Sequence, residues 1–168
     1  VGISRATQFG YSLFEFEVYG EKPAGIEALT PLHFIKLELT DAGGNLLSEN
    51  FYWRNGVRDL DYTLLNTLPE VELSCQLVDK SELSNGKVKI ALKNNAETVA
   101  FANRMRLVNK STQKRILPVI MSDNYVTLMP GEEKIISVEA EPELLKGDVS
   151  VLLKQYGKAE KNKLDIMF

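Results

Sequence analysis

The chain has 168 residues, 44% of them hydrophobic, and a formal net charge of −3. This length suits one large domain or two small ones and is too short for a complete (β/α)8 barrel of about 250 residues. The charge offers no basic field for nucleic acid or an anionic membrane, and no apolar run reaches the roughly 20 residues that span a bilayer. We therefore expect neither nucleic acid nor membrane as a partner.

Alternation of apolar and polar residues at period two predicts β-strands along most of the chain. In the first half the pattern covers 14–18 and 35–39, and the aromatic segment 46–53 continues it. The turn-forming stretch DAGGN, at 41–45, separates the last two of these segments. Asp, Gly and Asn tolerate tight turn geometry, so the two segments should form a hairpin.

The second half shows the same pattern at short, even spacing, with Gly, Pro, Asn or Asp near most joints. Strands are predicted over 87–94, 101–109, 114–121, 124–129, 133–141 and 148–155. Only 58–66 and 142–147 indicate helical turns, and both are too short to build a helical layer. The fold class predicted is all-β, an immunoglobulin-like β-sandwich.

A domain boundary is predicted at Pro69, where proline interrupts strand pairing and the hydrophobic pattern restarts at Val71. Residues 69–168 hold enough strands for a sandwich of ordinary size. Residues 1–68 hold only three or four, which predicts a smaller or incomplete β-sandwich segment. Such a segment would present an open strand edge that favours self-association.

Residues that could support catalysis or bind a metal are few. One histidine, His33, and one cysteine, Cys75, cannot supply the three or four ligands of a zinc site. Pairs of carboxylates occur at Glu15 and Glu17, Asp59 and Asp61, and Glu132 and Glu133, but nothing in their context indicates the burial that would raise a pKa. We predict no catalytic residue, no metal and no cofactor. His33 is expected to be half-exposed on a strand, and Cys75 to be a small core residue.

The aromatic stretch SENFYWRN allows two interpretations. Phe51 and Trp53 share one face with Leu47, which favours a role as core aromatic residues. The alternative is that Tyr52 and its neighbours form an exposed platform that stacks on a sugar ring.

The stretch SDNYVTLMPG also allows two interpretations. Asp123 and Asn124 are residue types that bond their own backbone two positions on, so they suit a turn after which Tyr125 starts a new strand. Val126 and Leu128 should then point inward. The alternative is that the polar tip of this loop and the Tyr125 hydroxyl dock against a neighbouring domain.

Two stretches, GGNLLSENFYWRN (43–55) and ILPVIMSDNYVTLMPGEEKIISVE (116–139), resemble the C-terminal region of family 2 glycoside hydrolases, in the β-mannosidase and exo-β-glucosaminidase branch. In that family a catalytic (β/α)8 barrel is followed by two immunoglobulin-like domains. The resemblance implies that this chain is the end of the first of these domains and all of the second. The family's catalytic glutamates lie on the barrel, so no catalytic residue is carried over to this sequence.

The resemblance implies a non-catalytic role that supports the barrel, with the other domains of the parent glycosidase as partners and carbohydrate bound only through that enzyme. The parent would hydrolyse β-mannosides, β-glucosaminides or β-galactosides, and a periplasmic or extracellular location is favoured. The rival interpretation is an independent carbohydrate-binding or adhesion module, which would carry a row of exposed aromatic side chains on one sheet face.

Overall fold

The computed structural model describes residues 3–6, 32–55, 62–145 and 147–167. The chain divides into two compact units, residues 1–67 and 68–168. This division falls next to the predicted boundary between residues 68 and 69. The strand predicted over 14–18 and the carboxylate pairs Glu15/Glu17 and Asp59/Asp61 lie outside the described residues.

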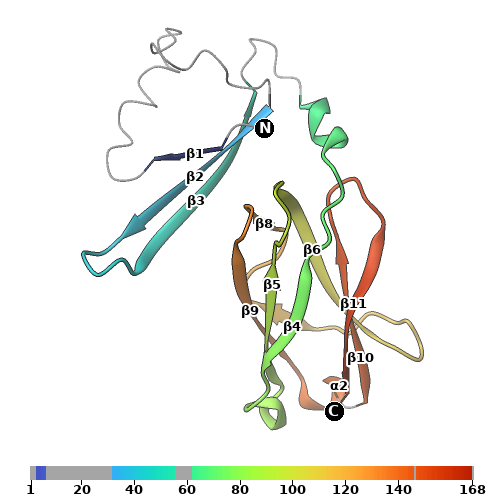
Figure 1. Ribbon diagram of the computed structural model, residues 1–168. Helices are drawn as coiled ribbons and strands as arrows, with labels where there is room; N and C mark the ends of the chain where they lie inside the picture. The colour runs from blue at the N-terminus through green and yellow to red at the C-terminus, as the bar shows by residue number, and fades with distance from the viewer. Residues whose placement is uncertain (1–2, 7–31, 56–61, 146, 168) are drawn as a thin grey trace, which may run out of the picture. The chain divides into compact units, whose positions relative to one another are not determined.

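The described part of the first unit contains a three-stranded sheet in the order β1-β2-β3 (Figure 1). β1 (Ile3–Ala6) runs parallel to β2 (Leu32–Thr40), which pairs antiparallel with β3 (Leu46–Asn55). The predicted hairpin is thereby confirmed. A 3-10 helix, η1 (Thr63–Thr67), follows and overlaps the helical turn predicted over 58–66.

The turn of the β2–β3 hairpin is closed by the carboxylate of Asp41. Its Oδ1 accepts hydrogen bonds from the backbone N–H of Gly43 at 2.9 Å and of Asn45 at 2.8 Å, and Oδ2 accepts one from the Asn45 side-chain amide at 2.8 Å. The bonds from Asn45 contribute most to holding the pKa of Asp41 below its ordinary value. The turn is therefore fixed by a local side-chain to backbone bond, as the residue types predict.

Two expectations about this hairpin are wrong. His33 is only 3% exposed rather than half-exposed, because β2 begins in a buried environment. Trp53 and Leu47 are 47% and 63% exposed, so neither is a core residue. Phe51 is half-buried and stacks on Phe34, with ring centroids 5.7 Å apart. The alternation predicted the strand but not which side chains of the strand would be covered.

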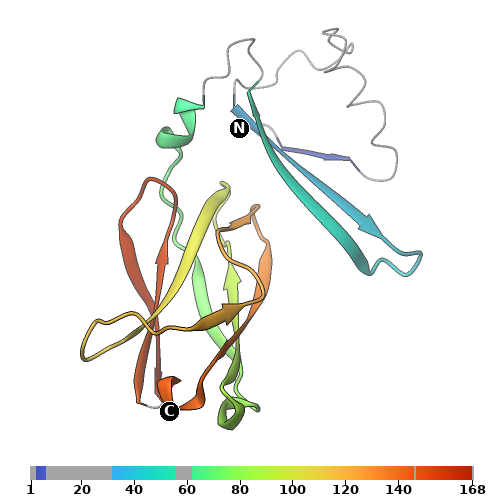
Figure 2. The ribbon, with the colours of Figure 1, turned by 180° about the vertical axis from the view of Figure 1, so that it is seen from behind.

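The second unit is a sandwich of two four-stranded antiparallel sheets, with strand orders β11-β10-β6-β8 and β4-β5-β9-β7 (Figures 1 and 2). Its strands are β4 (Ser74–Asp79), β5 (Lys87–Lys93), β6 (Ala100–Asn109), β7 (Val119–Met121), β8 (Val126–Leu128), β9 (Glu133–Ala140), β10 (Asp148–Lys154) and β11 (Glu160–Met167). Two short helices, η2 (Leu83–Asn85) and α2 (Pro142–Leu145), lie in its connections. The predicted all-β, immunoglobulin-like β-sandwich is confirmed.

Inward side chains of both sheets form one hydrophobic core. Val126 and Leu128 on β8 are buried, as predicted, and so are Ile136 and Val138 on β9. Cys75 packs partly buried against this core, and burial raises the pKa of its thiol to about 11. A thiol with so high a pKa is a packing group rather than a nucleophile.

Several strands of the sandwich differ from the sequence-based expectation, β7 and β11 among them. β7 covers only three residues of the predicted segment 114–121 and begins immediately after Pro118, which has no backbone N–H to donate to a sheet. β7 is the outermost strand of its sheet, a position at which a neighbouring proline is tolerated. β11 was not predicted, because its apolar residues are few and Leu164 and Ile166 are set among charged and polar ones.

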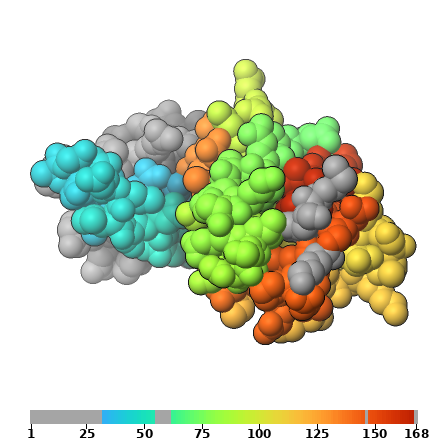
Figure 3. Space-filling model, turned by 90° about the horizontal axis from the view of Figure 1, so that it is seen from below, coloured from blue at the N-terminus to red at the C-terminus, as the bar shows by residue number. Residues whose placement is uncertain are grey.

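Gly86 is required where two connections of the sandwich meet. It lies at the end of η2 with φ 77°, and its carbonyl accepts a hydrogen bond from the Ala140 N–H at 3.0 Å. A Cβ atom at this position would lie 1.9 Å from the Ala140 carbonyl oxygen, so no other side chain fits without a backbone shift. Figure 3 views this end of the sandwich, where the turn before β5 (green) lies beside the segment after β9 (orange).

Candidate docking surface

Asn124 anchors the loop between β7 and β8 to a neighbouring strand. The Met105 N–H on β6 donates to Asn124 Oδ1 at 2.8 Å, and Asn124 Nδ2 donates to the Met105 carbonyl at 3.0 Å. The side-chain amide thus takes the place of a peptide group on an adjacent strand. This is a correction, because the sequence predicted bonds to the loop's own backbone two positions on.

Asp123 and the residue before it fix the same loop to β9. Asp123 Oδ1 accepts the N–H of Asn124 at 2.7 Å, and Oδ2 forms an ion pair with Lys134 Nζ at 2.6 Å. Ser122 donates its N–H to the Ser137 carbonyl at 2.9 Å and accepts the Ser137 N–H on its hydroxyl oxygen at 3.0 Å. The loop is therefore held from two strands of different sheets.

Tyr125 is the exposed tip of this loop. It was expected to start the strand, but β8 begins at Val126, and Tyr125 adopts a left-handed backbone with φ 57°. This conformation is unfavourable for an aromatic residue and persists only where the surroundings enforce it, here through Asn124, whose Oδ1 accepts the Tyr125 N–H at 2.8 Å. The side chain is 64% exposed, and its hydroxyl bonds to none of the residues that the structure describes.

A pocket of about 230 Å³ lies beside this loop, between β6 and the segment 115–121. Its lining is apolar at Leu117, Val119 and Met121 and cationic at Arg106 and Arg115, with no carboxylate. We call it the arginine pocket. Asn124 also lines it, so the pocket and the loop are neighbours.

The cations near the arginine pocket outnumber the carboxylate that they share. Glu160 accepts a hydrogen bond from Arg104 Nη2 at 3.1 Å and another from Arg106 Nη2. Partial burial opposes the ionisation of Glu160, but the bonds from the two arginines outweigh it and hold its pKa below the ordinary value. The Nε atoms of Arg104 and Arg106 are buried and have no acceptor among the described residues. Arg115 is exposed and forms no ion pair with any of the described residues.

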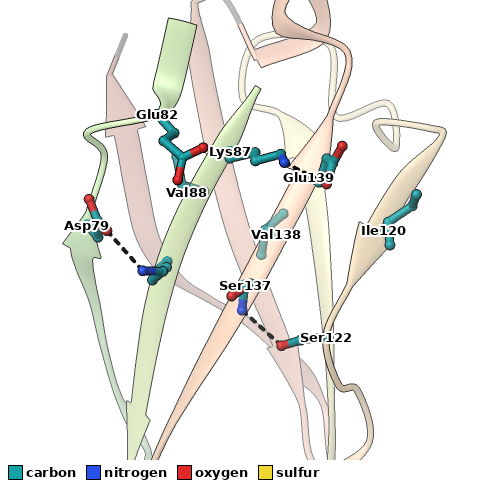
Figure 4. A pocket seen from close by; sticks show the side chains of 10 residues that line it. Asp79, Glu82, Lys87, Val88, Ile120, Ser122, Ser137, Val138 and Glu139 are labelled. Atoms are coloured by element: carbon teal, nitrogen blue, oxygen red, sulfur yellow. Dashed lines mark hydrogen bonds and ion pairs between the residues drawn. The ribbon is translucent and has the colours of Figure 1, made fainter. Parts of the chain in front are cut away.

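A second pocket, a shallow trough of about 340 Å³, lies on the sheet that contains β5, β9 and β7 (Figure 4). Both of its lysines are paired: Lys87 with Glu139 at 3.6 Å, and Lys89 with Asp79 at 3.2 Å, while a third carboxylate, Glu82, also lines the trough. The pKa of Asp79 falls to about 2, chiefly because its carboxylate accepts hydrogen bonds from Ser81 and, in addition, one from Lys89. The trough therefore has no lysine without a carboxylate beside it.

Several carboxyl groups in the described part of the chain have a shifted pKa. Those with resolved shifts all move downward, because each accepts hydrogen bonds from cations or amides; they are Asp41, Glu72, Asp79, Glu160 and Asp165. A general acid in a glycosidase needs the opposite shift. Across the same residues, no group of three or more His, Cys, Asp or Glu side chains is placed to hold a metal ion.

Tyr52, the residue suggested as a sugar platform, is half-buried on β3. The Arg54 guanidinium carbon lies 5.7 Å from the centre of its ring, which is the range of a cation–π contact. A role of Tyr52 in stacking on sugar stays a prediction. Among the helices that the structure describes, none is both long and apolar enough to cross a membrane.

The arginine pocket was missed by the sequence reasoning. A signal was available in RILPVIM, where apolar residues occupy both parities, so that not all of them can face the core of a two-layer sandwich. Leu117 is the result: it is 57% exposed, whereas its neighbour Ile116 is buried.

The sandwich topology defines an immunoglobulin-like domain. Residues 50–156 match the family of the exo-β-D-glucosaminidase Ig-fold domain, and the chain belongs to that family. The resemblance to the C-terminal immunoglobulin-like domains of family 2 glycoside hydrolases is thereby confirmed.

Curated relatives of this chain are named exo-β-D-glucosaminidases. The chain is 30% identical over 125 residues to an exo-β-D-glucosaminidase of Arthroderma benhamiae, covering 66% of this chain and 14% of that protein. It is 31% identical over 134 residues to the exo-β-D-glucosaminidase of Hypocrea jecorina, covering 67% of this chain and 15% of that protein. The chain therefore spans only 14–15% of the length of these relatives.

A solved structure agrees with the fold. The exo-chitosanase CsxA of Amycolatopsis orientalis superposes with a TM-score of 0.64 at 24% sequence identity, over 81% of this chain and 18% of that one. At this identity the likeness shows the fold alone.

Proposed function

We propose that this chain is a non-catalytic module of a longer exo-β-D-glucosaminidase-like glycoside hydrolase, in which a separate domain cleaves the β-O-glycosyl bond and this module supports that domain. The observation that carries the proposal is the match of residues 50–156 to the Ig-fold domain of exo-β-D-glucosaminidases. The small share of the relatives' length that the chain spans, 14–15%, supports the idea of a longer protein. Of the three sugar specificities that the resemblance left open, the names of the relatives favour β-glucosaminides.

The electrostatics of the described residues supports the non-catalytic part of the proposal. A retaining glycosidase needs two carboxyl groups about 5–5.5 Å apart, one of them with a raised pKa so that it can donate a proton. The carboxylates near the pockets are instead stabilised as anions: Glu160 by two arginines, and Asp79 by Ser81 and Lys89. An anion held in this way is a poor general acid at neutral pH.

We further propose that the loop formed by Asp123, Asn124 and Tyr125 contributes to contact with a neighbouring domain. Asn124 and Asp123 fix the loop to β6 and β9, so the Tyr125 ring is presented from a rigid base. A rigid exposed aromatic side chain loses little conformational entropy on binding, and tyrosine is enriched at protein interfaces for that reason.

The rival function is an independent carbohydrate-binding module. Trp53, exposed on the β2–β3 hairpin, is the observation in its favour. Across β4 to β11, however, the only aromatic strand residue is Phe101, which is buried, so these strands carry no aromatic row on a sheet face. A carbohydrate-binding role is thus left only for the β2–β3 hairpin.

Two experiments separate these functions. The gene should encode a further domain with a pair of catalytic carboxylates, and a reading frame without one would refute the proposal. The purified chain should not be retarded in affinity electrophoresis through chitosan; retardation that Trp53→Ala abolishes, while the exposed Tyr156→Ala does not, would establish the rival.

A further inference from the structure

The arginine pocket differs from the trough in its charge balance. In the trough each lysine named above has its own carboxylate, at 3.2 Å and 3.6 Å. Arg106 and Arg115 line the arginine pocket. Arg106 shares the carboxylate of Glu160 with the nearby Arg104, whereas Arg115 has no ion-pair partner among the described residues. Two positive charges are left over locally in a chain whose net charge is −3. Such an excess favours an acidic occupant.

The size of the pocket indicates a protein side chain rather than a small-molecule ligand. Its volume of about 230 Å³ is below the roughly 300–1,000 Å³ that is usual for ligand pockets. Leu117 lies on its wall and Tyr125 lies next to its lining residue Asn124, and both side chains are more than half exposed. Arginine and tyrosine beside an apolar pocket are typical of the residues that dominate protein–protein binding energy.

We propose that the arginine pocket receives an apolar side chain flanked by a carboxylate, supplied by another domain of the same longer polypeptide. The inference rests on the proposed function and deepens it, because it assigns the chemistry of the partner surface. A carboxylate beside Arg115 would form charge-assisted hydrogen bonds with its planar guanidinium, which has no ion-pair partner among the described residues. Covalent linkage supplies a high effective concentration, so a pocket for one side chain is sufficient.

The test compares two double variants in the full-length protein and in the isolated chain. Arg115→Glu with Leu117→Ser reverses the charge and removes the apolar wall. The control, Lys114→Glu with Leu144→Ser, makes the same types of change at exposed positions outside the pocket. Thermal unfolding is followed by calorimetry in all of these proteins.

We expect both double variants of the isolated chain to melt as the unsubstituted chain does, because none of the four side chains is buried. In the full-length protein only the pocket variant should lower the melting temperature, by several degrees, and separate the transition of the module from the rest. Equal melting of the two variants in the full-length protein would overturn the docking inference and leave the proposed function intact.

Two other outcomes would also overturn it. If the pocket variant alone destabilises the isolated chain, the pocket is an internal structural feature. If the isolated chain is a dimer that the pocket variant dissociates, the occupant is a second copy. A gene without a further domain would instead refute the proposed function itself.

Discussion

The β2–β3 hairpin and the sandwich of residues 68–168 are built from the same alternating sequence pattern, but they treat their apolar side chains differently. In the sandwich, Leu92 on β5 and Ile136 on β9 are both 0% exposed. In the hairpin, Leu32 and Phe34 on β2 are buried, whereas Leu47 and Trp53 on β3 are 63% and 47% exposed. The sandwich has two sheets that cover each other's inner faces, and this covering, rather than the alternating pattern by itself, decides which of its side chains become a core.

The largest expected effect contrasts one leucine in each region. Leu92→Ala should lower the free energy of unfolding by roughly 2–5 kcal/mol, because it leaves a cavity in a close-packed core. Leu47→Ala should change it by no more than about 0.5 kcal/mol, because the side chain is exposed. Urea unfolding of the two variants measures both values. Equal losses would mean that the hairpin has a core of its own.

A smaller loss of stability is expected from substitutions of two neighbouring residues, Asn124 and Asp123, in the loop between β7 and β8. Asn124→Ala should cost about 1–3 kcal/mol, because it leaves both the N–H and the carbonyl of Met105 without their partner. Asp123→Ala should cost at most about 1 kcal/mol, since its ion pair with Lys134 is partly exposed to solvent. Chemical unfolding of the two variants decides this, and a larger loss for Asp123→Ala would show that the loop is held mainly by its charge.

These two residues also show what the sequence could predict. Residue type and spacing predicted the turn at 122–125, the buried Val126 and Leu128, and the sandwich itself, because each depends on local geometry and period-two burial. The partner of Asn124 could not be predicted, since Met105 is distant in sequence and is brought near only by the pairing of β6 with β8. The exposure of Trp53 and the arginine pocket depend on three-dimensional packing in the same way.

The edge strands of the two regions also differ in length and charge. The sandwich has edge strands that are short, such as β7 and β8, or charged, such as β11, whereas β3 spans ten residues at the edge of its described sheet and exposes Leu46 and Leu47. Long apolar edges favour pairing with another chain. We expect the purified chain to self-associate, and Leu47→Lys to weaken this on the order of tenfold, equivalent to about 1.4 kcal/mol.

Light scattering over a range of concentrations measures the association. Leu144→Lys, an exposed substitution in α2, is the control and should leave it unchanged. If the chain stays monomeric at every concentration, the prediction that the apolar edge of β3 favours self-association is wrong.

The smallest expected effect concerns acid stability. Asp41 in the hairpin and Asp79 in the sandwich both accept hydrogen bonds from turn residues, and both have a lowered pKa. A carboxyl group with a lower pKa in the folded state stabilises fully above its ordinary pKa and loses this stabilisation as the pH falls toward the folded value. For Asp79 this window runs from the ordinary value of 3.8 down to about 2. Asp79→Asn should therefore make the melting temperature of the sandwich less dependent on pH in that window, and an unchanged slope would contradict the assignment.

The most direct test of the central claim is hydrolysis of p-nitrophenyl β-D-glucosaminide by the purified chain. We expect the chain to release no nitrophenol above the buffer rate, and the full-length protein that contains it to turn the substrate over. Turnover by the chain alone, abolished by replacing a single carboxylate such as Glu160 with its amide, would show that the chain is itself a glycosidase and would refute the non-catalytic role.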